Sequence, residues 1–425
     1  MVRSCPGAWQ TGVKGRPQAG EVPAEHRSRV RHRRSEPVPG RRRSRLPSPG
    51  RPYYRGAVPP GTPDGEGRGI VKPLPPEWFV PHDGNAEMRW DAPTGPGPHT
   101  PNERFFVRNH TRTPRIDPAA WRLRVHGSGL RGPGAVFSLA DLHALPARTL
   151  DAVLECAGNG RRYWAEQQGT PAPGTAWGLG GVGMAAWHGV PLGVLLERAG
   201  LGPAAVDVLA VGLDPEYRVD GRNLGRVRRP LPLAKALDGV LVAYGMNGEP
   251  LPPDHGAPAR LVVPGWVGVA SIKWLGELEV SDRPLESPWS TEFYRLFGPG
   301  HPVGGGPALT RQTVKSAFEL ASGAVLAAGR THRLRGRSWS GAAAVRTVEV
   351  STDGGRVWRP AELLDPPSRY GWRRWALDWR PDAPGRYGLR ARATDLLGRT
   401  QNAEAPFNRE GYLFDAVVVH PVTVV

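Results

Sequence analysis

Apolar residues in this chain occur in short runs that predict a fold built mainly of strands with a few short helices. Between residues 121 and 280, clustered or alternating apolar residues are typical of strands at Trp121–Gly127, Leu150–Leu154, Val206–Val211 and Leu261–Val263. Helical spacing instead follows the capping residue Ser138 and occupies Pro191–Ala199, where Gly200 ends the pattern. Strands and short helices therefore interleave as far as Val280, which predicts a mixed α/β domain.

The pattern changes after Leu309 to short alternating runs separated by turn residues. Val345–Ser351 and Tyr387–Thr394 alternate as strands, and Thr352–Gly355 predicts a hairpin turn with a return strand at Val357–Trp358. Such regular strands without helices indicate an antiparallel β-sandwich of the immunoglobulin-like class. Three tryptophans are expected to pack within the sandwich or at its interface, namely Trp372, Trp375 and Trp379. The fold class expected for the whole chain is therefore α+β.

Charge and composition divide the chain into segments. The 425 residues carry a formal net charge of +17, but residues 1–55 alone contain thirteen Arg and one Lys against three Glu. Residues 1–68 mix Arg with Pro, Gly and Ser and lack apolar periodicity, so we expect a disordered basic tail. We expect an extended, Pro-rich lead-in over 69–101, the mixed α/β domain over 102–297, a Gly/Pro linker over 298–308 and the sandwich over 309–425.

The arginine-rich tail is open to two interpretations. It is either a solvated extension or a segment that binds nucleic acid or an anionic surface. Apart from Trp9, Tyr53 and Tyr54 it has no Phe, Trp or Tyr that could stack on bases, so nucleic-acid binding is the alternative rather than the expected function. The sequence shows neither an export signal nor an apolar run of about 18 residues. These features predict a cytoplasmic protein without a membrane span.

Cys156, the one cysteine of the predicted folded region, stands where the strand Leu150–Leu154 opens into a loop. Two glycines and two arginines in Ala157–Arg162 allow close approach of a ligand and favour the thiolate. A lone buried cysteine is most often inert packing, and a nucleophile would need a histidine that is not near in sequence. A structural zinc site would need several ligands, whereas the only other cysteine is Cys5. The remaining interpretation is a thiolate that completes the coordination of a metal held by a cofactor.

Several separated motifs resemble the sulfite oxidase family of molybdopterin enzymes. In chain order they are Phe105-Phe106-Val107-Arg108-Asn109-His110, Cys156-Ala157-Gly158-Asn159-Gly160-Arg161, Asp254-His255-Gly256 and Lys273-Trp274-Leu275. Each motif alone would be weak, but their order makes the resemblance specific, and it extends from about residue 102 to the C-terminus. It implies a molybdopterin-binding oxidoreductase domain over 102–297 and a dimerisation domain over 309–425.

The resemblance assigns roles to residues that local patterns leave as turn formers, strand ends or packed aromatics. It implies that molybdenum is bound by a pterin dithiolene and by Cys156. It also implies that Arg108 and Arg161 hold the anionic substrate and that Tyr294 hydrogen-bonds to it, while Trp177 lines the pocket. The implied cofactor contacts are Val107, Arg108, Asn109, His110, Thr111, Cys156, Asp214, His255, Arg260, Ser271, Ile272 and Lys273. A carboxylate such as Asp214 suits the N–H donors of a pterin, and Arg260 suits a phosphate.

The implied reaction is oxygen-atom transfer, in which sulfite is oxidised to sulfate. One departure from the family concerns its third anion-binding arginine, which stands in a Trp-Asn-Leu-Arg-Gly pattern. This chain has Phe407-Asn408-Arg409-Glu410-Gly411 there, so Glu410 replaces a positive charge unless Arg409 acts from the neighbouring position. A molybdenum-dependent sulfoxide reductase, whose substrate is neutral, is therefore the alternative enzyme.

Partners and further cofactors follow from the same resemblance. His301-Pro302-Val303-Gly304 is faintly similar to a haem-ligand motif, but no flanking domain of suitable length is visible, so we expect no haem in this chain. The electrons are then expected to pass to a separate acceptor. A homodimer through the C-terminal domain is also expected.

Overall fold

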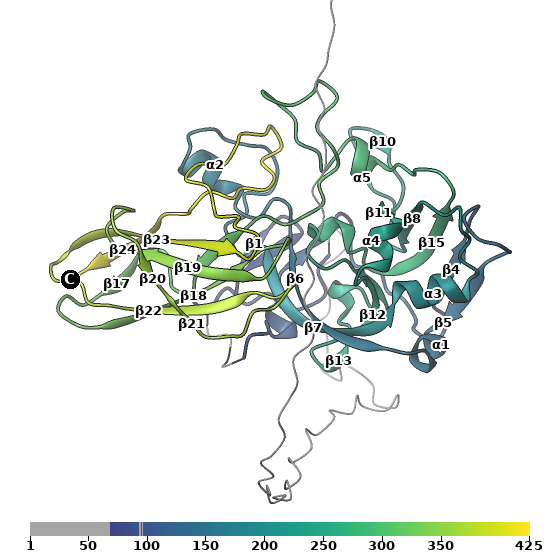
Figure 1. The fold of residues 1–425 in the computed structure, drawn as a ribbon, viewed down its shortest axis with the longest axis horizontal. Coiled ribbons are helices and arrows are strands. Elements are labelled where there is room, and N and C mark those ends of the chain that lie inside the picture. The colour runs from purple at the N-terminus through teal and green to yellow at the C-terminus, as the bar shows by residue number, and fades with distance from the viewer. Residues whose placement is uncertain (1–68, 93–94, 96) are drawn as a thin grey trace, which may run out of the picture. The chain divides into compact units, whose positions relative to one another are not determined.

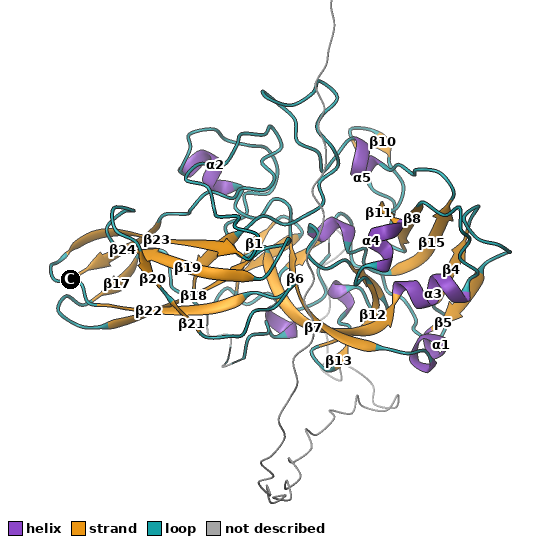
Figure 2. Cartoon of the chain, viewed as in Figure 1, coloured by secondary structure: helices purple, strands orange, loops and turns teal. Residues whose placement is uncertain are grey.

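The computed structural model describes residues 69–92, 95 and 97–425 of the chain. The predictions for the tail 1–68, its disorder and its nucleic-acid binding, lie outside these residues. The described chain is folded mainly into strands with a few short helices (Figure 2). Two multi-stranded sheets of the N-terminal region are followed along the chain by the two sheets of a C-terminal β-sandwich (Figure 1). The α+β class expected from the sequence is confirmed.

The first large sheet contains the alternating strand predicted after Trp121. Its strand order is β11-β8-β15-β4-β5, and only β15 and β4 pair in parallel. The strands are β4 (Arg122–His126), β5 (Ala135–Ser138), β8 (Asp207–Gly212), β11 (Arg228–Pro232) and β15 (Leu275–Ser281). Three short helices bury their apolar residues against it: α1 (Leu139–Ala144), α3 (Leu192–Arg198) and α4 (Leu233–Leu237). Ser138 caps α1 as predicted, since its hydroxyl accepts a hydrogen bond from the Asp141 N–H at 3.2 Å.

The second large sheet leads directly to Cys156. Its order is β13-β12-β7-β6, with β14 paired to β12. The strands are β6 (Arg148–Glu155), β7 (Val182–Pro191), β12 (Leu241–Met246), β13 (Glu249–Pro250) and β14 (Arg260–Val262). The last four residues of β6 are buried, so Cys156 follows a strand end enclosed by the core. Trp187 lies in β7, where its indole N–H donates to Ala152 O at 3.1 Å.

A small antiparallel sheet carries the start of the predicted cofactor loop. It consists of β1 (Phe79–His82), β2 (Asn85–Met88) and β3 (Val107–Arg108). Within the motif Phe105–His110, the strand β3 is only two residues long. It ends there because the Asn109 N–H donates to the side-chain Oδ1 of Asn85 at 3.0 Å rather than to a backbone carbonyl of β2. The short elements in the rest of this region are β9 (Arg218–Val219), β10 (Arg222–Asn223), α2 (Arg162–Glu166) and α5 (Pro288–Thr291).

The C-terminal sheets enclose an apolar core that includes Trp375 and Trp379. One sheet has the order β16-β18-β22-β21: β16 (Lys315–Phe318), β18 (His332–Trp339), β21 (Glu362–Leu363) and β22 (Arg373–Trp379). The other has the order β17-β24-β23-β19-β20: β17 (Ala324–Leu326), β19 (Val345–Ser351), β20 (Arg359–Pro360), β23 (Gly385–Asp395) and β24 (His420–Val424). Pairing is antiparallel except between β17 and β24. The return strand expected at Val357–Trp358 lies further on, at β20.

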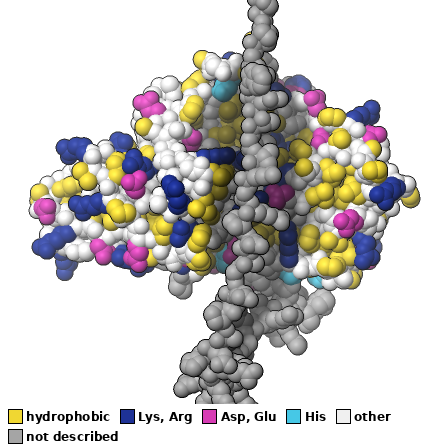
Figure 3. All heavy atoms as spheres, viewed as in Figure 1, with side chains coloured by type: hydrophobic (Ala, Val, Ile, Leu, Met, Phe, Trp, Pro, Cys, Tyr) yellow, Lys and Arg dark blue, Asp and Glu magenta, His cyan; other side chains and the backbone are white. Residues whose placement is uncertain are grey.

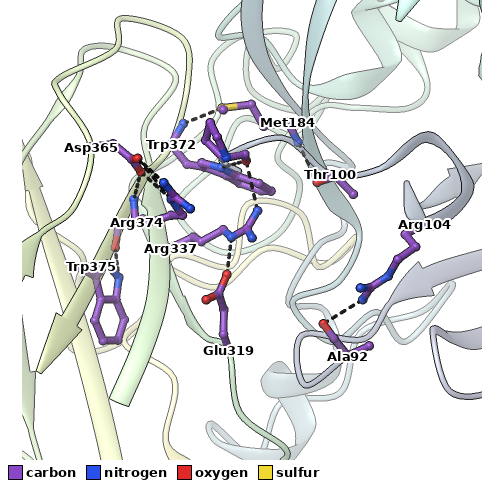
Figure 4. Close-up of polar contacts among 12 residues, drawn as sticks. Ala92, Thr100, Arg104, Met184, Glu319, Arg337, Asp365, Trp372, Arg374 and Trp375 are labelled. Carbon is purple, nitrogen blue, oxygen red and sulfur yellow. Dashed lines mark hydrogen bonds and ion pairs between the residues drawn. The ribbon is translucent and has the colours of Figure 1, made fainter. Parts of the chain in front are cut away.

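Trp372 joins the sandwich to the N-terminal region. Its backbone N–H contacts Met184 Sδ at 3.3 Å, and its indole N–H donates to Pro98 O at 2.7 Å. Next to it, Arg337 donates to Glu319 at 2.5 Å (Figure 4). The expectation that the tryptophans of this region lie in the sandwich or at its interface is therefore confirmed.

The surface drawn in Figure 3 shows basic and acidic side chains interspersed among apolar ones. Within the described part of the chain, no helix is long and apolar enough to cross a membrane.

Candidate functional site

One cavity gathers residues from segments that are far apart in the chain. It encloses about 770 Å³, part of which is open to solvent. Its walls come from β3 and the loop after it, from the end of β6, and from two short 3₁₀ helices, Pro253–His255 and Gly268–Ala270. The implied site residues that line it are Arg108, Asn109, His110, Cys156, Asp214, His255, Arg260, Ser271, Ile272, Lys273 and Tyr294.

Four of the residues named from the sequence do not line this cavity. Val107 is buried beside it, because successive strand residues point to opposite faces and its neighbour Arg108 faces the cavity. Thr111 instead supports a lining residue, since its hydroxyl donates to Asp214 Oδ2 at 3.4 Å. Trp177 packs against Phe106 at a ring distance of 6.3 Å.

Arg161 is the fourth such residue, and backbone carbonyls hold its guanidinium. Its Nε donates to Glu410 O at 3.1 Å, and its Nη1 donates to Thr175 O at 3.0 Å. The guanidinium also lies 5.3 Å from the ring centre of Tyr412. A Cβ at Gly158 would come within 2.7 Å of this guanidinium, so a larger residue there would displace the Arg161 side chain. The role of Arg161 in substrate binding stays a prediction.

Cys156 lies in a loop that buried polar contacts fix on several sides. Its N–H donates to Gly181 O at 2.9 Å, and its carbonyl accepts from the Asn159 N–H at 2.9 Å. The Asn159 side chain donates to Glu155 Oε1 at 3.0 Å, and Lys315 Nζ lies 2.8 Å from the same oxygen. The Cys156 side chain is 8% exposed and faces the cavity. The thiol is therefore held where it can bind a ligand inside the cavity.

Tyr294 and Arg108 form a polar wall of the cavity near Cys156. The Tyr294 hydroxyl is 3.1 Å from His110 Nε2, and its ring stacks on Tyr412 at 5.2 Å. Tyr294 has a φ of 56°, a left-handed conformation that is rare for an aromatic residue and typical of functional sites. Burial raises the pKa of Tyr294, although Arg108 acts in the opposite direction. The phenol therefore remains a hydrogen-bond donor at neutral pH.

The guanidinium of Arg108 is a stable positive charge in this wall. Burial lowers its pKa, but the nearby side chains of Tyr294, Cys156, Tyr412 and Tyr217 together raise it, and the net pKa is above the ordinary value. Its Nη1 donates to the carbonyl of Asn109, which directs the side chain along the loop after β3. An anion that enters this part of the cavity meets a charged donor.

A second group of cations, Arg260 and Lys273 together with His255, lines another part of the cavity. Arg260 donates to His255 O and to Ser271 O, both at 2.9 Å, and Lys273 donates to Asp254 O at 2.9 Å and to the Asn109 side chain. Burial lowers the pKa of Arg260 to about 9 and moves the pKa values of Lys273 and His255 well below their ordinary values. Buried cations are costly without a counter-charge, so this arrangement is suited to an anionic ligand.

Asp214 presents an acceptor to the same cavity. Its Oδ1 is buried and accepts no hydrogen bond of normal distance and angle from the described residues. Burial raises the pKa of Asp214 to about 6, although nearby N–H groups and Lys273 act against this rise. A ligand with N–H groups would satisfy this orphaned acceptor. The donors and acceptors of the cavity thus fit an anionic pterin.

A metal in this cavity would need ligands beyond the protein. No group of three or more His, Cys, Asp or Glu side chains in the described ranges is arranged to hold a metal ion. Cys156 is the soft ligand on the cavity wall, which fits a metal whose other ligands belong to an organic cofactor.

Comparison with known proteins agrees with this chemistry. Residues 110–289 match the model of an oxidoreductase molybdopterin binding domain. The chain is 37% identical over 294 residues to mitochondrial sulfite oxidase of Mus musculus, covering 65% of this chain and 52% of the mouse protein. It is also 37% identical over 295 residues to sulfite oxidase of Gallus gallus, covering 65% of this chain and 62% of the chicken protein. The chain is therefore similar to sulfite oxidases, and residues 110–289 match a molybdopterin-binding oxidoreductase domain.

A likeness to a solved structure extends over most of the chain. The sulfane dehydrogenase SoxCD from Paracoccus pantotrophus superposes with a TM-score of 0.68 and 27% sequence identity. The match covers 87% of this chain and 92% of that chain. The molybdopterin-binding domain implies the molybdenum cofactor, as expected. The chain spans about half the length of the mitochondrial sulfite oxidase that it matches.

Sequence reasoning missed several residues that shape the site. Asn159 belongs to the cysteine motif, and its asparagine type was a usable signal for a loop-fixing hydrogen bond. Tyr412 and Lys315 are distant in sequence, and nothing local marks them. Lys72 in the lead-in reaches His255 at 3.3 Å, and it too was read only as part of an extended segment.

Proposed function

We propose that this protein is a sulfite oxidase, which oxidises sulfite to sulfate by oxygen-atom transfer and passes two electrons to a separate acceptor. The observation that supports this most is the convergence of Cys156, Arg108 and Tyr294 on one cavity. A soft ligand for molybdenum, a fixed positive charge and a neutral hydrogen-bond donor suit a reaction whose substrate and product are sulfur oxyanions. Sulfite oxidases with 37% identity lend further support.

When bound, the molybdenum cofactor supplies oxygen-atom transfer and two-electron redox chemistry. The Cys156 sulfur would bind the metal, and Asp214 would accept hydrogen bonds from the pterin. The cations Arg260 and Lys273, with His255, would hold the phosphate. These residues line the cavity, and the orphaned Asp214 oxygen and the buried positive charges have the character that such a ligand requires.

Arg108 and Tyr294 would bind and orient the substrate. Arg108 keeps its charge because its net pKa is above the ordinary arginine value in spite of burial. A raised pKa keeps Tyr294 protonated, and His110 at 3.1 Å fixes the direction of its hydroxyl. Both groups are therefore preorganised for an oxyanion, which reduces the free energy needed to reorient them during the reaction.

A second candidate substrate is a sulfane sulfur compound. Glu410, which stands where the family resemblance places a third anion-binding arginine, is only partly buried, and Arg409 beside it is exposed. The solved structure with high coverage of both chains is a sulfane dehydrogenase. A pocket with less positive charge would favour a substrate that carries less charge at the reacting sulfur than sulfite does.

The test is sulfite-dependent reduction of ferricyanide by the molybdenum-loaded protein. We expect saturable reduction with sulfite, and weaker turnover with a sulfane sulfur compound or with methionine sulfoxide under reducing conditions. Turnover of the sulfane compound without turnover of sulfite would replace the proposal with the second candidate. Turnover of methionine sulfoxide alone would instead identify a sulfoxide reductase.

The proposal also includes a homodimer formed through the C-terminal sandwich. Sedimentation equilibrium of the full chain tests this part separately, because association does not depend on the substrate. A monomer over the micromolar range would contradict it.

A further inference from the structure

The segment at residues 69–72, which we call the N-terminal strap, is bound to the cofactor cavity by specific contacts. The backbone N–H groups of Val71 and Lys72 donate to the Asp254 carboxylate at 2.8–3.1 Å. The Gly69 carbonyl accepts from the Thr113 N–H at 3.1 Å, and the Thr113 hydroxyl donates to Asp254 Oδ1 at 2.6 Å. The strap precedes the residues that match the family's domain model. It nevertheless contacts the Asp254-His255 loop directly.

These contacts place the ammonium group of Lys72 beside His255. Lys72 Nζ lies 3.3 Å from His255 Nε2, donates to the carbonyl of Phe105 and is 3.4 Å from Asn102 O. Nζ also lies over the ring of Phe79, 4.8 Å from the ring centre. His255 lines the cavity, so Lys72 stands immediately behind one of its walls.

Lys72 adds a third cation to a buried cluster that already contains Arg260 and Lys273. Burial is the largest cause of the lowered pKa of His255, and the charges of all three cations lower it further. All three charges therefore act on the His255 imidazole. Burial lowers the pKa of Lys72 to about 7, although Asp254 and Glu103 act against this change. The Asp254 carboxylate is occupied by the strap N–H groups and by Thr113. The cluster thus has more positive charge than its own carboxylates balance.

A phosphate group would supply the missing negative charge. It carries close to two negative charges at neutral pH and accepts several charge-assisted hydrogen bonds. A lysine side chain has three rotatable donors on a flexible stem, so Lys72 can turn from the Phe105 carbonyl toward an anion near His255.

We propose that Lys72 is a further ligand of the cofactor's phosphate group, supplied by the N-terminal strap from outside the matched domain. This inference rests on the cofactor site described above and adds to it a residue that secures the bound cofactor. It does not depend on which sulfur compound is oxidised.

The experiment compares Lys72→Met and Lys72→Arg with a matched control, Lys235→Met. Lys235 is also half-buried, lies 5.7 Å from a tyrosine ring centre and has a pKa lowered by burial, but it belongs to α4 and does not line the cavity. Two quantities are measured: pterin and molybdenum per chain in the purified proteins, and the affinity of the cofactor-free proteins for inorganic phosphate.

We expect Lys72→Met to lower phosphate affinity at least about tenfold, the size of one charge-assisted hydrogen bond, and to lose cofactor during purification. Lys72→Arg should keep most of both properties, and Lys235→Met should behave like the unaltered protein. Unchanged phosphate affinity in Lys72→Met would overturn the inference, and so would an equal loss in Lys235→Met. An unaltered protein without pterin would refute the proposed function instead, while the phosphate measurement would still decide the role of Lys72.

Chemical labelling of lysines in the unaltered protein gives a second test that does not depend on whether the variants fold correctly. Acetylation of lysine amines is followed by mass spectrometry with and without inorganic phosphate. We expect phosphate to protect Lys72 and to leave Lys235 unchanged. Equal labelling of Lys72 in both conditions would overturn the inference.

Discussion

Lys315 Nζ lies 2.8 Å from Glu155 Oε1, and both side chains are 3% exposed. Lys315 is the first residue of β16 in the sandwich, whereas Glu155 immediately precedes Cys156. The same ammonium donates to Asn159 O at 2.8 Å. The Asn159 side-chain Oδ1 in turn accepts a hydrogen bond from the Gly181 N–H at 2.9 Å. The sandwich therefore holds the cysteine loop through a buried ion pair.

This ion pair predicts a large stability difference between two lysine substitutions. Lys315→Met leaves Glu155 buried without its counter-charge, so the free energy of unfolding should fall by about 3–5 kcal/mol. Lys235 pairs with the half-exposed Asp238 at 3.5 Å, and Lys235→Met should cost about 1 kcal/mol or less. Urea unfolding of the full chain measures both. Equal, small losses would show that the buried pair does not stabilise the loop.

Asp214 should stabilise the bound cofactor but lower the free energy of unfolding of the cofactor-free protein. Burial raises its pKa from an ordinary 3.8 to about 6, so the folded state binds an extra proton between these values and stability declines as the pH rises through this range. Above pH 6, cofactor-free Asp214→Asn should be more stable than the unaltered protein by up to roughly 3 kcal/mol. The gain should vanish below about pH 4.

The measurement is thermal or urea unfolding of the two cofactor-free proteins from pH 4 to 8, together with their pterin content after purification. Asp214→Asn should retain less pterin, because a carboxylate that accepts N–H bonds is lost. A gain that is constant across the pH range would mean that ionisation of Asp214 is not its cause.

Tyr294→Phe should slow sulfite oxidation while leaving the fold intact. Loss of one hydrogen bond to a charged substrate corresponds to about a 10- to 100-fold decrease in kcat/KM. The matched control is Tyr412→Phe, because Tyr412 stacks on Tyr294 at 5.2 Å but does not line the cavity. Tyr412→Phe should lower kcat/KM for sulfite less than Tyr294→Phe does.

The ionisation of Tyr294 gives a prediction for the pH dependence of activity. Burial raises the pKa of Tyr294 above 10, so its hydroxyl should remain protonated and donate throughout the neutral and mildly alkaline range. The alkaline limbs of the kcat/KM profiles of the unaltered protein and Tyr294→Phe should therefore have the same shape up to about pH 10. An alkaline loss of activity that disappears in Tyr294→Phe would show that this phenol ionises earlier.

Glu410→Arg should improve sulfite binding if the exchange of charge at this position limits affinity. The carbonyl of Glu410 accepts from Arg161 Nε at 3.1 Å, and a side-chain substitution keeps this backbone contact. We expect KM for sulfite to fall about tenfold, the effect of one charge-assisted contact, with little change in kcat. Arg409→Ala, at the exposed neighbouring position, should change neither constant. An unchanged KM for sulfite in Glu410→Arg would show that the charge at this position does not affect substrate binding.

The sequence predicted those parts of the fold and site that depend on local patterns or on a recognised motif. The buried end of β6 before Cys156, the cap at Ser138 and the strand at Val345–Ser351 follow from apolar spacing and capping chemistry. Motif matching named most of the residues that line the cavity, although it could not show which way the Arg161 side chain turns, because that depends on carbonyls of two distant loops.

Other contributions could not be predicted because they arise only from contacts between remote segments. Lys72 and Lys315 are isolated lysines in an extended lead-in and a sandwich strand, and no local pattern indicates their partners. Each lysine brings its ammonium group to a buried site about 160 or more residues away in sequence. Lys72 reaches His255, and Lys315 reaches Glu155 and Asn159.

X-ray absorption at the molybdenum edge tests the central claim most directly, because it reports the atoms bound to the metal. The purified, cofactor-loaded protein should show sulfur ligation of molybdenum, and Cys156→Ser should lose part of that sulfur signal while retaining pterin. An identical sulfur signal in Cys156→Ser, or a purified protein that contains no molybdenum, would contradict the account.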